Sequence, residues 1–256
     1  MATALLHDLL RRLSSAILRT HDHVFVSRPR SMVAEVVIYG QSDSCYSPYG
    51  DHFRKVRKVV TVHLLIDVLL SRQHEYGLTR NHIKAILLDM FEAGTDTSYS
   101  TLDVAMAELM RKPEAMAKLQ AEVRRMVPRG QEIDGCGCTR RRRSSLSACW
   151  DNPHDFMPER FMDGNNHVDL KGKTDFRYVP FGAGRRMCPG IHAAAATLEI
   201  MLANLVYRFD WELPAGVRKE DIDMTEVFGL TVHRKEKLFL VPKPACICMC
   251  LSRVVI

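Results

Sequence analysis

A ten-residue loop at positions 181–190 constrains this 256-residue chain more than any other stretch. It reads Phe-Gly-Ala-Gly-Arg-Arg-Met-Cys-Pro-Gly and stands directly before an apolar run at 191–206 that is typical of a helix. The free N–H groups at a helix start and the positive end of its dipole favour an anion at that place. Cys188 occupies this place, so its sulfur is predicted to bind a metal as a thiolate.

The residues around Cys188 favour a flat ligand. Gly184 and Gly190 allow tight backbone and leave room beside the chain, while Arg186 offers a fixed charge to a carboxylate. One thiolate, a flat pocket and an arginine predict haem held by an axial sulfur, with a propionate paired to Arg186. The alternative for a lone cysteine is a buried, inert thiol. With Phe181 the pattern has five fixed positions, which makes it more specific than a lone glycine motif.

The composition is that of an ordinary globular protein, with 46% hydrophobic and 26% charged residues. The length predicts a single domain over residues 1–256. The net charge is +6, but residues 140–143 are four consecutive arginines, so the basic balance is local and no nucleic-acid partner is expected. Eight cysteines without disulfide spacing indicate a reducing compartment. No apolar run reaches the length of a membrane span, so no anchor is expected.

Helical spacing recurs along the chain. Residues 4–19 predict an amphipathic helix, for which a core-facing position is favoured over a membrane surface. Thr79 is a predicted N-cap of a helix over residues 80–112 that Pro113 ends, and residues 113–127 predict the next helix. Inside the long helix, Ala-Gly-Thr-Asp-Thr at 93–97 predicts either a local bulge that frees a carbonyl or a close packing contact at the glycine.

Residues 134–149 are small, basic and rich in cysteine, with no apolar periodicity, and they predict a disordered linker. A basic run can also contact nucleic acid, and Cys136 with Cys138 can join a metal site. We favour a third interpretation, in which the segment is aberrant sequence from a misjoined gene.

The loop and the 93–97 motif occur in the order found in cytochromes P-450, and the chain resembles that superfamily. The sequence segments at 19–23, 27–32 and 47–58 resemble those of its plant A-type microsomal branch. The resemblance implies a mainly α fold with small β-sheets, here incomplete. After position 65 the sequence continues directly with the segment that precedes the long helix. Helices D to G, which cover the substrate pocket in the family, are therefore expected to be missing.

The resemblance also assigns roles to single residues. It implies that Thr97 holds the iron-bound oxygen and a water, that Asp96 feeds protons, and that Gly94 leaves space above the haem. Arg57 would reach a haem propionate, four residues after Phe53, which stands where the family has tryptophan.

Further positions follow from the same resemblance. Phe228 and Leu230 belong to a turn that lines the substrate pocket, and residues 245–256 form a tail beyond the usual ending. The helix K Glu-x-x-Arg pair is expected to be absent, since Glu122 and Arg125 have the spacing of that pair but lack the flanking sequence found in the family. Arg160 would therefore lack its two usual partners.

The implied activity is a monooxygenation that puts one atom of O2 into a small hydrophobic substrate of plant specialised metabolism. The implied cofactor is haem b, and the implied partner is a flavin-containing reductase that supplies electrons from NADPH. Location at the endoplasmic reticulum membrane is implied by the family, whereas the expected lack of an anchor favours a cytoplasmic or unstable chain. Because the roof and the helix K pair are expected to be missing, activity is predicted to be weak or absent, and the alternative is a non-catalytic remnant that binds haem or a partner. A weaker alternative is a zinc- or nucleic-acid-binding protein built on residues 134–149.

Overall fold

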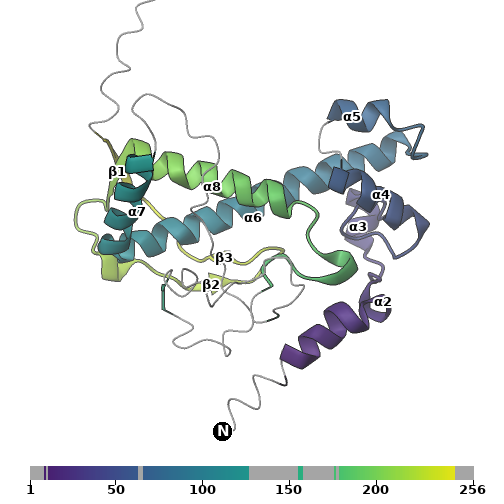
Figure 1. Ribbon diagram of the computed structural model, residues 1–256, viewed down its shortest axis with the longest axis horizontal. Helices are drawn as coiled ribbons and strands as arrows, with labels where there is room; N and C mark the ends of the chain where they lie inside the picture. Colours follow the sequence, from purple (N-terminus) through teal and green to yellow (C-terminus); the bar gives the residue numbers. More distant parts are fainter. Residues whose placement is uncertain are drawn as a thin grey trace, which may run out of the picture. The chain divides into compact units, whose positions relative to one another are not determined.

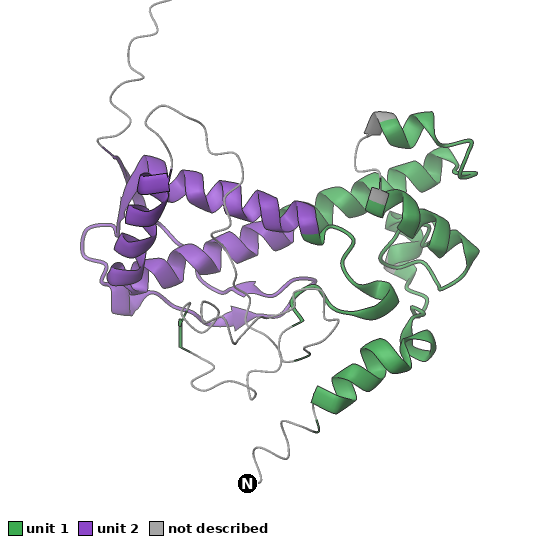
Figure 2. Cartoon of the chain, in the orientation of Figure 1, with its two compact units in different colours: residues 1–95, 142–191 green, residues 96–141, 192–256 purple. Residues whose placement is uncertain are grey.

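The computed structural model shows a mainly helical chain with two small antiparallel sheets in the part that it describes (Figure 1). The described residues are 9, 11–62, 66–126, 155–157, 176 and 179–245. Their contacts form two compact units, and each is described here by itself (Figure 2). Unit 1 takes its residues from 1–95 and 142–191, and unit 2 takes them from 96–141 and 192–256.

Unit 1 consists of short helices and the first half of the long helix α6. Its main apolar core joins valines of α4 (Val56, Val59 and Val60) to Leu69 and Ile86. The valines recur at helical spacing, so one face of α4 is buried. The helices of unit 1 that precede α6 are η1 (a π-helix, Ala16–Thr20), α2 (Asp22–Phe25), α3 (Met32–Val37), α4 (Asp51–Val62) and α5 (Ile66–Ser71). The loop at 181–190 adds the short 3-10 helix η4 (Gly184–Arg186).

Helix α6 (Arg80–Arg111) passes from unit 1 into unit 2 and confirms the predicted helix and its cap. The backbone N–H of His82 donates to the Thr79 hydroxyl at 3.2 Å, and the Thr79 N–H donates to Nδ1 of His82 at 3.3 Å. This is a reciprocal capping box with histidine in the third position. Residues 93–97 are α-helical without interruption, so the expected bulge is not present in the backbone.

Unit 2 packs α7 (Pro113–Met126) and α8 (Ile191–Arg208) with short strands; α7 ends one residue before its predicted end, and α8 begins as predicted and extends two residues beyond the run at 191–206. Strands pair antiparallel as β1 with β4, in the register Phe209 to Pro244, and as β2 with β3. Ala245, placed by prediction in the tail, is buried, and its N–H donates to the Arg208 carbonyl at 2.9 Å. The remaining elements are β1 (Phe209–Glu212), η5 (Lys219–Asp221), β2 (Glu226–Val227), β3 (His233–Arg234) and β4 (Val241–Pro244).

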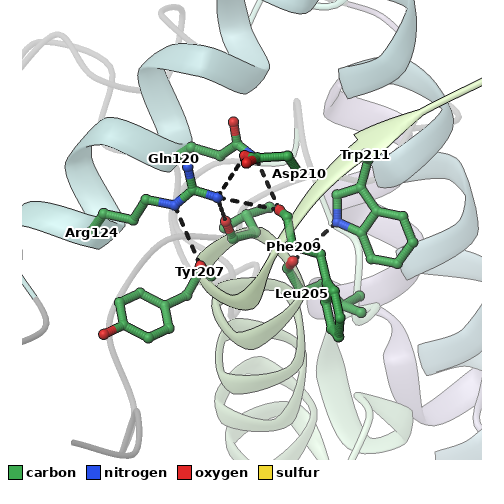
Figure 3. A network of polar contacts seen from close by, with 8 residues as sticks. Gln120, Arg124, Leu205, Tyr207, Phe209, Asp210 and Trp211 are labelled. Carbon is green, nitrogen blue, oxygen red and sulfur yellow. Dashed lines mark hydrogen bonds and ion pairs between the residues drawn. The ribbon is translucent and has the colours of Figure 1, made fainter. Parts of the chain in front are cut away.

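Arg124 of α7 holds the end of α8 and the start of β1 (Figure 3). Its guanidinium donates to the carbonyls of Val206 and Phe209 at 3.1 and 3.3 Å and pairs with Asp210 at 2.8 Å. The last carbonyls of a helix have no N–H partner within that helix, so the Arg124 guanidinium provides hydrogen-bond donors at the end of α8. Glu122 and Arg125, which have the Glu-x-x-Arg spacing, are exposed on the same helix.

The prediction that the first helix faces the core is wrong for its described residues. Leu9, Leu13 and Ile17 are 53%, 48% and 39% exposed. Periodicity identifies an amphipathic helix but does not say what covers its apolar face. Among the described residues, no helix combines the length and the apolar character that a membrane crossing requires.

Three predictions lie outside the described residues. They concern the linker at 134–149, the partners of Arg160, and the tail beyond Ala245.

Candidate functional site

The loop that carries Cys188 is folded back on itself within unit 1. The N–H of Cys188 donates to the Phe181 carbonyl at 2.8 Å, and the N–H of Met187 donates to the Gly184 carbonyl at 3.2 Å. Gly182 and Gly184 have φ angles of +69° and +68°, in the left-handed region that glycine adopts without steric cost. The loop places the partly buried Cys188 three residues before the start of α8.

The two predicted site glycines serve different ends. A Cβ at Gly190 would lie 3.9 Å from Sγ of Cys188, so the glycine keeps the space beside the sulfur open. A Cβ at Gly184 would overlap the carbonyl oxygen of Leu18 and lie 3.1 Å from a carboxylate oxygen of Asp22. Gly184 is therefore required by the close approach of η1 and α2, because the room beside it is already filled.

Arg57 of α4, the predicted propionate partner, lies beside the loop. Its guanidinium donates to the carbonyl of Met187, the residue before Cys188. Burial lowers the pKa of Arg57, and the negative charge that Cys188 can carry acts in the opposite direction.

Arg186 is held almost entirely by backbone carbonyls. Its guanidinium donates to Val26 at 2.7 Å, to Ser44 at 3.3 Å and to Ser47. The guanidinium carbon also lies 3.7 Å from the centre of the buried Phe53 ring, so this phenylalanine keeps the ring packing expected at a tryptophan position.

The arginines beside Cys188 form a positively charged group. The pKa of Arg186 is lowered first by burial and then by the charges of Arg28 and Arg57. Within the described part of the chain, no carboxylate forms an ion pair with Arg57 or Arg186. Such a cluster favours an anionic ligand, since mutual repulsion is relieved by negative charge. The thiol, the open side at Gly190 and two guanidiniums therefore fit a flat ligand with carboxylates, as haem is.

The motif at 93–97 lies on α6. A Cβ at Gly94 would meet no heavy atom within 4 Å, so among the described residues no close packing contact explains this glycine. The carboxylate of Asp96 accepts a hydrogen bond from the Thr231 hydroxyl, and the Thr97 carbonyl accepts one from the Thr101 hydroxyl at 2.7 Å. Gly94 belongs to unit 1, whereas Asp96 and Thr97 belong to unit 2.

The predicted substrate residues lie on the turn between β2 and β3. Phe228 and Leu230 are 85% and 71% exposed. Two large apolar side chains in water on one turn are available to contact an apolar molecule.

A second group of possible metal ligands lies in unit 1. The ligand atoms of Asp43, Cys45 and Asp89 are within 4.8 Å of one another. Burial and the charge of Asp89 raise the pKa of Asp43. The two carboxylates accept hydrogen bonds from nearby backbone N–H groups, those of Tyr46 for Asp43 and of Ser44 for Asp89.

Sequence reasoning missed the residues that hold the predicted site residues in place. Asp22 accepts the N–H of Arg185, the neighbour of the predicted Arg186, at 3.1 Å, and the Thr231 hydroxyl donates to Asp96. The contact from Arg186 to Val26 joins residues 160 positions apart. Periodicity reports neighbours within one element, so no local pattern carries a signal for these contacts.

Comparison with known proteins identifies the family. The cytochrome P-450 family model matches residues 54–136 and 145–241. The chain is 36% identical to an indole-2-monooxygenase of Zea mays, over 91% of this chain and 78% of that protein. It is 42% identical to an indolin-2-one monooxygenase of Zea mays over 70% of this chain, which spans 43% of that protein. It is 38% identical to a desmethyl-deoxy-podophyllotoxin synthase of Sinopodophyllum hexandrum over 70% of this chain and 45% of that protein.

The first of these alignments extends over 420 residues, whereas the chain has 256, so the relative contains internal stretches with no counterpart here. The fold is similar to that of a zebra fish cytochrome P-450 solved with abiraterone. The TM-score is 0.73 at 15% identity, over 91% of this chain and 92% of that one. The family model, the relatives and the fold agree with the thiolate loop. The chain is a shortened member of the cytochrome P-450 family.

Proposed function

We propose that this chain binds haem b through the sulfur of Cys188 and acts as a monooxygenase on a small hydrophobic substrate. Membership of the family implies a haem cofactor and electrons supplied by a reductase. The observation that carries the proposal is that Arg57 lies beside the partly buried thiol of Cys188 and that, among the described residues, neither Arg57 nor Arg186 forms an ion pair with a carboxylate. When bound, haem would supply the activation of O2, with one atom entering a C–H bond and the other leaving as water after two electrons and two protons.

The chain's own residues would bind, orient and deliver protons. Arg57 and Arg186 would hold the carboxylates of the ligand, and Gly190 would leave room for a flat group beside the sulfur. Asp96 would move protons inward from solvent, and Thr97 would hold a water by its hydroxyl. The roles of Phe181 and Gly184 would be to shape the loop, through the bond from the Cys188 N–H and through close approach to η1.

The substrate would be a small apolar molecule, as it is for relatives named for indole and indolin-2-one. Phe228 and Leu230 support this class, because both are large apolar side chains exposed on one turn. NADPH is the proposed electron source through a flavoprotein reductase, and the endoplasmic reticulum membrane is the proposed location.

The test of the ligand is reconstitution of the full chain with haem, followed by the difference spectrum of the reduced carbon monoxide complex. A thiolate-type Soret band is expected for the natural chain. It should disappear in Cys188→Ala, because the loop contains no second thiol. The matched control is Cys45→Ala, which removes the second free cysteine that the structure describes and should keep the band. A band that survives in Cys188→Ala refutes the assignment.

A second candidate function is haem binding without oxygen chemistry. It is favoured by the internal stretches that the indole-2-monooxygenase has and this chain lacks, because a shortened chain has fewer residues with which to enclose a substrate. The two candidates differ in turnover. With reductase, NADPH and indole, product formation supports the monooxygenase, whereas a thiolate band without any product supports the non-catalytic protein.

A further inference from the structure

The turn between β2 and β3 is fixed to α6 by two side-chain contacts, both within unit 2. The Thr231 hydroxyl donates to Oδ2 of Asp96. Arg234 donates from Nε to Oδ2 of Asp103 at 2.8 Å and from Nη2 to Oδ1 at 3.4 Å. One segment of four residues therefore contacts two carboxylates of the same helix.

The spacing of these contacts matches on both elements. Asp96 and Asp103 are seven residues apart, which corresponds to about 10.5 Å along an α-helix. Thr231 and Arg234 are three residues apart, which corresponds to at most about 10 Å of chain. The four-residue segment is therefore long enough to reach both carboxylates, and it runs along α6.

The two contacts differ in burial and charge. The side chains of Arg234 and Asp103 are 2% and 13% exposed, and Arg234 also donates to the Asp223 carbonyl at 2.8 Å. The two charges of this pair therefore neutralise each other, and the pair holds β3 against α6. At the other contact a neutral hydroxyl donates to a partly buried carboxylate, and among the described residues no cation forms an ion pair with Asp96. Among the described side chains, the Thr231 hydroxyl is the donor that orients Asp96.

We propose that Thr231 is a positioning residue for Asp96. Its hydroxyl holds Oδ2 and thereby leaves Oδ1 to take up and release a proton in one orientation. The Arg234–Asp103 pair holds the segment so that the hydroxyl stays in reach. This inference rests on the proposed function, because the proton that Asp96 would move is needed only for reduction of O2.

The first test needs no catalysis. In the full chain labelled with ¹³C at aspartate, the side-chain carboxyl resonance of Asp96 is assigned by its loss in Asp96→Asn. Thr231→Val keeps the shape of the side chain but removes the donor, so this resonance is expected to shift. Thr231→Ser keeps the hydroxyl and should leave the resonance near its original position. The matched control is Thr225→Val, which removes an exposed threonine hydroxyl bonded to Asp223 at 2.6 Å and should leave Asp96 unchanged. An Asp96 resonance that does not move in Thr231→Val overturns the inference.

The second test follows electrons in the haem-loaded chain with reductase, NADPH and indole. Thr231→Val should lower product formation about tenfold, a part of the roughly 100-fold or more that positioned proton transfer contributes. A larger share of the electrons from NADPH should then reduce O2 to hydrogen peroxide. Thr231→Ser should restore the share of electrons that reach product, which a merely structural loss would not explain. Equal product per NADPH in Thr231→Val and the natural chain overturns the inference, whereas the absence of a thiolate band in the natural chain overturns the proposed function instead.

Discussion

Removal of one partner of the buried pair Arg234–Asp103 should destabilise unit 2, and the size of the loss can be estimated from the burial of the pair. With side chains only 2% and 13% exposed, removal of one partner leaves a charge with little water around it. Breaking such a pair costs about 3–5 kcal/mol. The pair Lys243–Glu212 is as short, at 2.6 Å, but its side chains are 57% and 54% exposed. Pairs of that kind contribute about 0–1 kcal/mol.

The assay is urea unfolding followed by circular dichroism. With a slope of about 1–3 kcal/mol per molar urea, a loss of 3 kcal/mol lowers the midpoint by about 1–3 M. Arg234→Met should show this shift, and the control Lys243→Met should show less than a third of it. Adding Asp103→Leu to Arg234→Met should recover part of the loss, because no unpaired charge then stays buried. Equal midpoints for Arg234→Met and Lys243→Met would refute the reasoning.

Two further predictions concern unit 1. Gly182→Ala and Gly184→Ala both force a side chain into the left-handed region, at about 1–2 kcal/mol. Only Gly184→Ala also overlaps the Leu18 carbonyl, so its melting temperature should fall further, and equal losses would contradict the packing assigned to Gly184. Burial, with a smaller effect from His52, lowers the pKa of His82 below its unfolded value, so its contribution to stability is present above about pH 6.5 and lost as the pH falls towards the folded pKa. His82→Gln keeps an acceptor for the Thr79 N–H without titrating, and the urea midpoint of this variant should depend less on pH in that window.

Long elements with local signals could be predicted from the sequence. The helix α6 begins after Thr79 and ends before Pro113 because the cap and the proline act on their immediate neighbours. The loop before α8 was predictable for the same reason, since its glycines and Cys188 act within ten residues. The family follows from these two motifs in order.

Contacts between distant residues could not be predicted. Arg186 donates to the carbonyls of Val26, Ser44 and Ser47, and no pattern near Arg186 in the sequence predicts these partners, whereas its pairing with a carboxylate of the cofactor stays a prediction. From the residues alone, Gly94 was expected either to pack closely or to interrupt the helix, yet α6 continues through it with open space beside it; the space above the haem that the resemblance implies for Gly94 stays a prediction. In both cases the outcome depends on what other segments bring to the residue, and that information is absent from its neighbours in the chain.

The charges of the described residues separate structural pairs from groups that remain available for chemistry. Arg234 and Asp103 neutralise each other in a buried contact, so neither retains charge for another partner. Arg57 and Arg186 are instead held by uncharged carbonyls, and Asp96 is held by an uncharged hydroxyl. A neutral partner fixes the position of an ionic side chain without cancelling its charge. Arg57 and Arg186 can therefore still attract an anion, and the carboxylate of Asp96 has no cationic partner among the described residues, which is what the proposed monooxygenase requires of each.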